Sequence, residues 1–378
     1  MEAGRFLDIL EDLGGSVFTG VPDSLLSPFI DEIMDRFGLS EKHTVAANEG
    51  AAAGLAAGHY LATSQPAVVY MQNSGIGYAV NPICSLLHEK VYSIPVIFVI
   101  GWRGEPGIKD EPQHVFQGEI TLPLLDCLEI PYVLISEETA ADELQSDISR
   151  FKQHIHDGRS VAFVIRKGAL TNQKKAEYTS DANLSREDTL TEILTYDTSG
   201  KQDNTVYVCT TGKLSREIFE IRERLGQGHG SDFLTVGSMG HSLMIAYGIA
   251  MAKPEKRVFC LDGDGAVLMH MGSLAVTGAY GPENLIHIVI NNGSHETVGG
   301  LPTAGIKLDF SEIAKSMGYR RVKRVASKAE LADILNVLSG TDGPVMIEVM
   351  CNLHSRSDLG RPTVAPLQNR NELMDNLK

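Results

Sequence analysis

Two short polar segments, each following an apolar one, contain the residues whose types and spacing could do chemistry. Residues 262–265 (Asp-Gly-Asp-Gly) follow Val-Phe-Cys-Leu, and residues 291–294 (Asn-Asn-Gly-Ser) follow Leu-Ile-His-Ile-Val-Ile. The apolar segments predict buried strands, with a helix of about 15 residues between them. Crossovers of this kind are right-handed, and parallel strands end at one edge of their sheet. We therefore expect Asp264 and Asn292 to converge outside two strand ends.

The ligands that these two turns offer are oxygens: a carboxylate, an amide and loop carbonyls. Mg²⁺ binds such oxygens and usually takes only one or two carboxylates, completing its coordination with phosphate oxygens and water. Asp-Gly and Asn-Gly are also common turn dipeptides. The separation of 28 positions between Asp264 and Asn292, with strand, helix and strand in the expected places, favours a metal site over two unrelated turns.

This pattern resembles the diphosphate-binding domain of thiamine-diphosphate-dependent enzymes, in which Gly-Asp-Gly is followed by Asn-Asn at about this spacing. The resemblance implies that Mg²⁺ is held by Asp264, by the side chain of Asn292 and by the carbonyl of Ser294. It also implies that the same loop binds the cofactor's diphosphate near a helix N-terminus. The loop residues expected there are Gly263, Gly265 and Ala266.

Two further segments match the same family. Its members use a glutamate on a separate domain to hydrogen-bond the aminopyrimidine ring, and residues 47–54 place Glu49 in that position. A bulky aliphatic side chain wedges between the two cofactor rings and a nearby carbonyl accepts from the amino group, roles that Met239 and Gly237 match. Without these flanking motifs, Glu49 would simply complement a helix N-terminus and Met239 would be a core residue.

The resemblance implies a decarboxylase in which the cofactor carries the difficult chemistry. Glu49, partly buried so that its neutral form is accessible near pH 7, would share its proton with the pyrimidine N1′. Residues 19–24, 73–82 and 101–107 resemble compact members that decarboxylate phosphonopyruvate or sulfopyruvate. The expected reaction converts 3-phosphonopyruvate to phosphonoacetaldehyde and CO₂.

The expected substrate has a doubly charged phosphonate, yet the chain itself is acidic. It has 33 Lys and Arg against 48 Asp and Glu, a formal charge of −15. Local basic groups must therefore offset the phosphonate. A Gly/Pro-rich segment that follows the strand ending at residue 100 is placed like a binding or closing loop. The candidate substrate ligands are Asp23, Ser24, Arg103, Lys109, His114 and Lys213, with Arg356 and Arg361 as further candidates.

The sequence departs from the larger 2-oxo acid decarboxylases of this superfamily at two places. Those enzymes have a histidine pair on the loop matching Asn73-Ser74 and a glutamate where Val298 stands. Asp23 does match their active-site aspartate. Two residues remain open as the group that protonates the reaction intermediate: Asp23, and His295, which follows the metal-binding loop. His295 is equally compatible with capping a loop.

The elements that must position these residues alternate between strands and helices. In the first half, strands are predicted at 16–20, 43–47, 67–71, 95–100, 132–136 and 160–165. In the second half, strands are predicted at 205–209, 233–236, 257–261, 285–290 and 345–350. Such alternation predicts, in each half, a doubly wound α/β domain with a mostly parallel sheet and helices on both faces.

The composition becomes polar between the two halves. We predict a pyrimidine-binding domain over 1–170, a linker over 171–200 with a short helix near 186–194, and a diphosphate-binding domain over 201–378. In this superfamily the active site forms between domains of different subunits. The resemblance therefore implies a homodimer or a larger homo-oligomer.

Several classes of protein are disfavoured by composition. There is no Lys/Arg run typical of a nucleic-acid binder, no apolar run of membrane-spanning length and no signal peptide. Five dispersed cysteines without a CxxC motif favour a reduced, cytoplasmic protein over disulfides or zinc. Three alternatives remain open: a sulfopyruvate decarboxylase, an acetolactate-synthase-like carboligase and a non-catalytic thiamine-diphosphate-binding protein.

Overall fold

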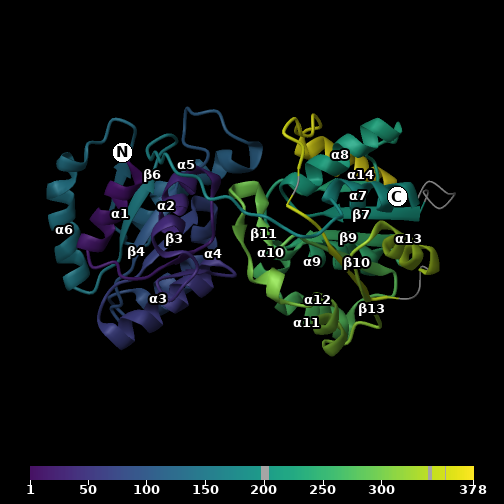
Figure 1. Ribbon diagram of the computed structural model, residues 1–378, viewed down its shortest axis with the longest axis horizontal. Helices are drawn as coiled ribbons and strands as arrows, with labels where there is room; N and C mark the ends of the chain where they lie inside the picture. Colours follow the sequence, from purple (N-terminus) through teal and green to yellow (C-terminus); the bar gives the residue numbers. More distant parts are fainter. Residues whose placement is uncertain (197–203, 339–342, 354) are drawn as a thin grey trace. The chain divides into compact units, whose positions relative to one another are not determined.

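The computed structural model describes residues 1–196, 204–338, 343–353 and 355–378. Contacts within the chain divide it into two compact units, Met1–Glu177 and Tyr178–Lys378 (Figure 1). The division falls inside the predicted linker of 171–200. The short helix predicted there is present as α7 (Arg186–Tyr196), and it packs against two helices of the second unit.

The first unit contains a six-stranded sheet in the order β2-β1-β3-β4-β6-β5, with every neighbouring pair parallel. Its strands are β1 (Phe18–Gly20), β2 (His43–Val45), β3 (Val68–Gln72), β4 (Ile97–Gly101), β5 (Tyr132–Ile135) and β6 (Val161–Ile165). Its helices are α1 (Ala3–Asp12), α2 (Ser27–Phe37), α3 (Glu49–Thr63), α4 (Ile76–Pro82), α5 (Pro112–Cys127) and α6 (Gln145–His156). The central strands are buried along almost their whole length, as in sheets covered on both faces.

Helices cover both faces of this sheet. On one face, Phe6 of α1 packs edge-to-face against Phe29 of α2 and Phe163 of β6, with ring centroids 5.5 and 5.3 Å apart. On the other face, α3 presents small alanines such as Ala52 and Ala56 to the apolar side chains of β3 and β4. Small residues let this helix approach the sheet closely, which brings its N-terminus near the strand ends.

The second unit contains a six-stranded parallel sheet in the order β13-β14-β10-β9-β7-β8. Its strands are β7 (Thr205–Cys209), β8 (Asp232–Leu234), β9 (Arg257–Gly263), β10 (Leu285–Asn291), β13 (Arg321–Val325) and β14 (Val345–Met350). Its helices after α7 are α8 (Lys213–Leu225), α9 (Ser242–Ala252), α10 (Asp264–Met269), α11 (Gly272–Tyr280), α12 (Phe310–Ser316), α13 (Lys328–Val337) and α14 (Pro366–Asn376). A small antiparallel ribbon joins β11 (Ser294–His295) to β12 (Leu301–Pro302).

Two apolar clusters fill the space on either side of this second sheet. One cluster contains residues of α7, α8 and α13, and the other contains residues of α9, α11 and α12. Figure 1 shows α7 and α8 on one side of the strands and α11 and α12 on the other. This is the doubly wound arrangement that the sequence predicts for each half.

The two sheets have the same topology. Counted in chain order within each unit, and without the small ribbon, the strands lie in the order second, first, third, fourth, sixth and fifth. The chain therefore reverses its direction of winding between the first and third strands of each sheet. Ligands of open α/β sheets bind beyond the carboxyl ends of the strands at such a reversal.

Two details differ from the prediction. The single helix of about 15 residues expected after Asp264 is two helices, α10 and α11, because His270 leaves the helical region with φ −136° and ψ 45°. The edge strand β13 was not predicted, because its sequence Arg-Val-Lys-Arg-Val is largely charged and exposed, as protected edges often are. In the described part of the chain, every helix is too short or too polar to span a lipid bilayer.

Candidate active site

The polar residues of the first unit gather at the carboxyl ends of β1, β3 and β4. Asp23, which follows β1, is fully buried and accepts hydrogen bonds from Gln72 Nε2 at 2.8 Å and from the backbone N–H of Leu25 at 3.1 Å. Burial raises the pKa of Asp23, against the lowering effects of Gln72 and Arg103. Because Asp23 follows the first strand and Gln72 ends the third, this bond spans the point where the winding reverses.

Arg103 follows β4 and is held between two carboxylates. Its Nε and Nη2 donate to the two oxygens of Asp110 at 2.8 and 2.5 Å, and its Nη1 donates to Ser24 Oγ at 3.0 Å. The same Nη1 lies 4.0 Å from Asp23 Oδ1. Asp110 also accepts from His114 Nδ1 at 2.9 Å. Four of the predicted substrate ligands, Asp23, Ser24, Arg103 and His114, therefore lie together.

The loop that carries Arg103 is fixed through its backbone. Asn73 Nδ2 donates to the Arg103 carbonyl at 2.8 Å, and Asn73 Oδ1 accepts from the Arg103 N–H at 3.2 Å. The next residue, Gly104, has φ +68°, and a Cβ there would lie 1.8 Å from the carbonyl oxygen of His114. Only glycine allows this close approach of the loop to α5. By contrast, the predicted ligand Lys109 lies exposed on this loop.

Glu49 is the first residue of α3, and it lies over the turn after β3. Asn48 caps the helix by accepting from the N–H of Ala51 at 2.8 Å. The Glu49 side chain is 4% exposed, and its Oε2 has no hydrogen-bond partner. A Cβ at Gly75 would lie 2.3 Å from Glu49 Oε1, so the glycine makes room for this carboxyl group. Burial raises the pKa of Glu49 to about 7.

A buried carboxyl group with one oxygen that lacks a hydrogen-bond partner, and with a pKa near neutrality, suits the aminopyrimidine ring that the family resemblance predicts as its partner. The ring nitrogen of an aminopyrimidine can accept or release a proton at such a group. The geometry at Glu49 is therefore compatible with thiamine diphosphate, whereas a carboxylate that only complemented a helix N-terminus would remain solvated and acidic.

In the second unit, Asp264 and Asn292 converge as the sequence predicts. Asp264 begins α10 and is 2% exposed; its carboxylate accepts from the Thr303 hydroxyl and from backbone N–H groups, including that of Asn292. Burial raises the pKa of Asp264 to about 6. Asn292 Oδ1 accepts from the N–H of Ser294 at 3.1 Å, and the buried Ser294 Oγ has no hydrogen-bond partner.

This donor set fits Mg²⁺. It contains one carboxylate, one amide oxygen and a loop with carbonyl groups, and the partners described for Asp264 are neutral donors rather than cations. Thr303, whose hydroxyl bonds to Asp264, was missed by sequence analysis, because it lies 39 residues away and no motif marks it.

The other predicted cofactor residues surround the start of α10. A Cβ at Gly265 would lie 3.0 Å from the ring of His295 and 3.3 Å from Met239 Cε, so these three residues are neighbours. Met239 is half-buried. Burial lowers the pKa of His295 to about 4, so its ring is neutral at pH 7.

The loop before α9 is strongly bent around Met239. Ser238 has φ +54° and Gly240 has φ +88°, so left-handed residues flank Met239 on both sides. A non-glycine residue in this conformation costs energy and is held only by its surroundings. Gly237, whose carbonyl is predicted to accept a hydrogen bond from the cofactor's amino group, precedes this bend and is partly exposed.

The predicted ligand Lys213 is bound elsewhere within the second unit. Its Nζ donates to Glu296 Oε1 at 3.0 Å and to Ser355 Oγ at 2.7 Å. Glu296 also accepts from Arg186 Nη1 at 2.6 Å and from Asn292 Nδ2 at 3.0 Å. Burial would raise the pKa of Glu296, but Arg186 and Lys213 outweigh it and lower the pKa. The side chain of Glu296 thus links Lys213 to the predicted metal ligand.

No sequence motif marks this network, because Arg186 and Glu296 are 110 residues apart. Arg356, a further candidate, is likewise engaged in the same unit, where it forms ion pairs with Glu187 and Glu220. Both Lys213 and Arg356 therefore already pair with carboxylates of the second unit.

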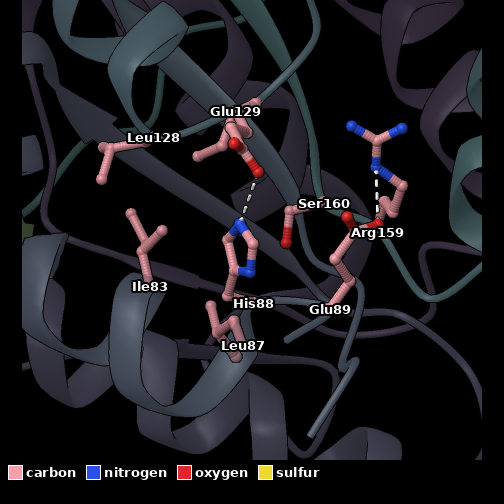
Figure 2. Close-up of a pocket in the computed structure, with 9 residues that line it drawn as sticks. Ile83, Leu87, His88, Glu89, Leu128, Glu129, Arg159 and Ser160 are labelled. Atoms are coloured by element: carbon pink, nitrogen blue, oxygen red, sulfur yellow. Dashed lines mark hydrogen bonds and ion pairs between the residues drawn. The ribbon is translucent and has the colours of Figure 1, made fainter. Parts of the chain in front are cut away.

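A pocket in the first unit lies away from Asp23, Glu49 and Arg103 of the same unit (Figure 2). Its lining includes Leu128 and Ser160, which precede β5 and β6, so it opens at the amino ends of the strands. Within it, His88 pairs with Glu129 at 3.1 Å and Arg159 pairs with Glu89 at 3.2 Å. The predicted site residues are at the opposite edge of the sheet.

Comparison with known proteins identifies the family. Residues 3–125 match the family model of the thiamine pyrophosphate enzyme N-terminal TPP binding domain, and residues 211–349 match that of the C-terminal TPP binding domain. Phosphonopyruvate decarboxylase of Streptomyces viridochromogenes is 33% identical over 372 residues, covering 95% of this chain and 90% of that protein. The enzyme of the same name from Streptomyces hygroscopicus is 32% identical over 97% of this chain and 91% of its own length.

A shorter match is to the sulfopyruvate decarboxylase subunit beta of Methanothermobacter thermautotrophicus, 34% identical over 40% of this chain and 76% of that subunit. The two matched segments contain the motifs at Glu49 and Asp264. The chain belongs to the thiamine pyrophosphate enzymes, and within them to the family of the phosphonopyruvate decarboxylases.

Proposed function

We propose that this protein catalyses the thiamine-diphosphate- and Mg²⁺-dependent decarboxylation of 3-phosphonopyruvate to phosphonoacetaldehyde and CO₂, as a step in phosphonate biosynthesis. The observation that carries the proposal is the buried Glu49, with a pKa of about 7 and an oxygen that has no partner. The similarity to phosphonopyruvate decarboxylases over nearly the whole chain supports the choice of substrate.

The residues proposed to hold the cofactor lie in both units. Asp264, the side chain of Asn292 and the carbonyl of Ser294 would hold Mg²⁺, and the loop at Gly263, Gly265 and Ala266 would contact the diphosphate. Met239 and the carbonyl of Gly237 would contact the rings. Bound thiamine diphosphate supplies an electron sink for the electrons released as CO₂ leaves. Glu49 holds or releases a proton near pH 7, which matches a general acid–base role.

At the substrate end, Arg103, His114 and Ser24 are proposed to face the phosphonate, and Asp23 to provide the proton that replaces CO₂. The raised pKa of Asp23 favours a protonated carboxyl group that can donate. The lowered pKa of His295 makes that histidine the weaker choice, because its neutral ring is a poor acid. Lys213 is proposed to support the metal loop rather than to bind substrate, because its ammonium group pairs with Glu296.

The decisive experiment is a decarboxylation assay with phosphonopyruvate, with and without thiamine diphosphate and Mg²⁺. We expect aldehyde and CO₂ only when both are present. The match to a sulfopyruvate decarboxylase subunit makes sulfopyruvate the second candidate substrate. A higher kcat/KM for sulfopyruvate would overturn the choice of substrate, and acetolactate-type products in place of free aldehyde would indicate a carboligase. Binding of the cofactor without turnover of any 2-oxo acid would indicate a non-catalytic protein.

We further propose a cytoplasmic homodimer or larger homo-oligomer. The proposed cofactor residues are divided between the two units, and the family resemblance implies active sites between subunits. The cysteines, of which Cys84 and Cys127 are exposed, are all free, as in a reduced compartment. Light scattering tests the assembly, and an active monomer would contradict it.

A further inference from the structure

Asp110 is the most heavily hydrogen-bonded carboxylate of the first unit's site, although it is not among the site residues predicted from the sequence. It accepts two bonds from the guanidinium of Arg103, one from His114 Nδ1, and one each from the backbone N–H groups of Gly104 and Glu111, at 2.5 to 2.9 Å. It thus binds the loop after β4 to the start of α5. Five donors leave this carboxylate no role as an acid or base.

The bidentate bond fixes the plane of the Arg103 guanidinium. Nε and Nη2 point to Asp110, and Nη1 points to Ser24. These bonds engage three of the five N–H groups of an arginine, which leaves two on the same plane for a ligand. Arginine in this fixed, forked geometry suits the oxygens of a tetrahedral anion better than a free lysine does.

Asp110 also determines how the ring of His114 is oriented. When the ionised carboxylate accepts from Nδ1, the hydrogen is on Nδ1 and the far nitrogen, Nε2, faces away from Asp110. Burial would raise the pKa of Asp110, but Arg103 and His114 hold it well below its usual range, so the carboxylate stays ionised. One carboxylate therefore holds two basic side chains close together.

We propose that Asp110 is the positioning residue of an anion subsite formed by Arg103, His114 and Ser24, which takes the phosphonate group of the substrate. This inference rests on the proposed function, because that function supplies the phosphonate. Asp110 does not touch the substrate itself. It sets the orientation of the Arg103 and His114 side chains, and so determines discrimination between a 2-oxo acid with a distal dianion and one without it.

The test uses the full-length protein and the only tryptophan of the chain. Trp102 precedes Arg103, is buried, and donates from Nε1 to the carbonyl of Gly118 at 3.0 Å, so its fluorescence reports on this loop. Phosphonoacetate, a phosphonate without the 2-oxo group, is titrated into protein without cofactor. We expect a saturable change in wild type, a Kd raised roughly tenfold to hundredfold in Asp110→Asn, and no response to acetate.

Glu111→Gln is the matched control, because it removes the same charge one position away while the backbone N–H that Asp110 accepts remains. We expect its phosphonoacetate Kd to stay within about twofold of wild type. In turnover assays, Asp110→Asn should raise KM for phosphonopyruvate far more than it changes kcat/KM for pyruvate. Asp110→Glu, which keeps the acceptor charge, should restore part of the affinity.

Each outcome separates this inference from the proposed function. If Asp110→Asn folds, as judged by circular dichroism, and binds phosphonoacetate like wild type, the positioning role is wrong. An equal effect of Glu111→Gln would also contradict it, because local charge alone would then account for binding. If wild type binds phosphonoacetate in an Asp110-dependent manner but does not decarboxylate phosphonopyruvate, the subsite stands and the proposed function fails.

Discussion

The carboxyl edges of the two sheets carry similar pairs of acidic residues in different surroundings. Each edge has a buried carboxyl group whose described partners include no cation: Glu49 in the first unit and Asp264 in the second. Each also has a carboxylate bonded to two basic side chains: Asp110, with Arg103 and His114, and Glu296, with Arg186 and Lys213. Burial raises the pKa of the first kind, and cations lower the pKa of the second.

This difference separates carboxyl groups that can still bind a ligand from carboxylates that already bind and orient basic side chains of the protein. A buried carboxylate without a cation is costly unless a proton, a metal or a ligand compensates it. Glu49, with its pKa of about 7, can be compensated by a shared proton, whereas Asp264, near other oxygen donors, suits a cation. Asp110 and Glu296 already have their partners, so their expected effects are indirect and smaller.

The largest expected effect is that of Glu49→Gln. Glutamine has the same shape but cannot release or accept the proton, so kcat should fall by about 10²- to 10⁴-fold, the usual contribution of general acid–base catalysis. Thiamine diphosphate affinity, measured by calorimetry, should change much less. Activity within a few-fold of wild type would show that Glu49 is only a structural residue.

Asp264→Asn should come next. Loss of the carboxylate removes the single negative ligand proposed for Mg²⁺, so the Mg²⁺ concentration needed for half-maximal cofactor binding should rise by about 100-fold. Calorimetric titration of thiamine diphosphate at several Mg²⁺ concentrations measures this. Asp262→Asn, two residues earlier, is a comparison variant whose Mg²⁺ dependence should be unchanged. If wild type and Asp264→Asn need the same Mg²⁺ concentration for half-maximal cofactor binding, Asp264 is not a metal ligand.

The pH dependence of stability provides a third test. The pKa of Glu49 is raised in the folded protein, so its contribution to stability is complete below its unfolded pKa and is lost as pH rises towards 7. Glu49→Gln removes this loss of stability. Without cofactor, the Tm of the variant relative to that of wild type should therefore rise from pH 5 to pH 8, by an amount equivalent to about 2 kcal/mol in the free energy of unfolding. A constant Tm difference would mean that burial does not shift this carboxyl group.

Glu296→Gln should have a smaller effect than Asp264→Asn. Glu296 accepts from the amide of Asn292 and so keeps Asn292 Oδ1 facing the metal loop, but it is not a ligand itself. Its removal should weaken Mg²⁺-dependent cofactor binding by roughly fivefold to tenfold, as loss of an outer hydrogen bond to a ligand typically does. Lys213→Met, which removes only one of the partners of Glu296, should have less effect. A loss as large as that of Asp264→Asn would instead make Glu296 a direct ligand.

Much of the fold followed from the sequence because its signals are local. Alternating apolar segments placed the central strands β7, β9 and β10 within two residues of their ends, and a parallel crossover placed Asp264 beside Asn292. Glu49 was identifiable as a motif at a helix start. The edge strand β13 and the break at His270 were missed, because a charged edge has no apolar period and helix interruption depends on packing.

The sequence by itself determined the family, the two parallel sheets and the residues that follow their strands, because periodicity and motif spacing depend only on neighbouring residues. Only the tertiary structure decided which charged side chains can still bind a ligand and which are already paired within the protein. It paired Lys213 with Glu296 and placed Asp110 between Arg103 and His114. It also buried Glu49 without a partner for one oxygen. Burial and ion pairing arise when distant segments pack together. Burial and ion pairing, rather than residue type, therefore set the pKa of each ionisable side chain and determine which of its hydrogen-bond donors are free.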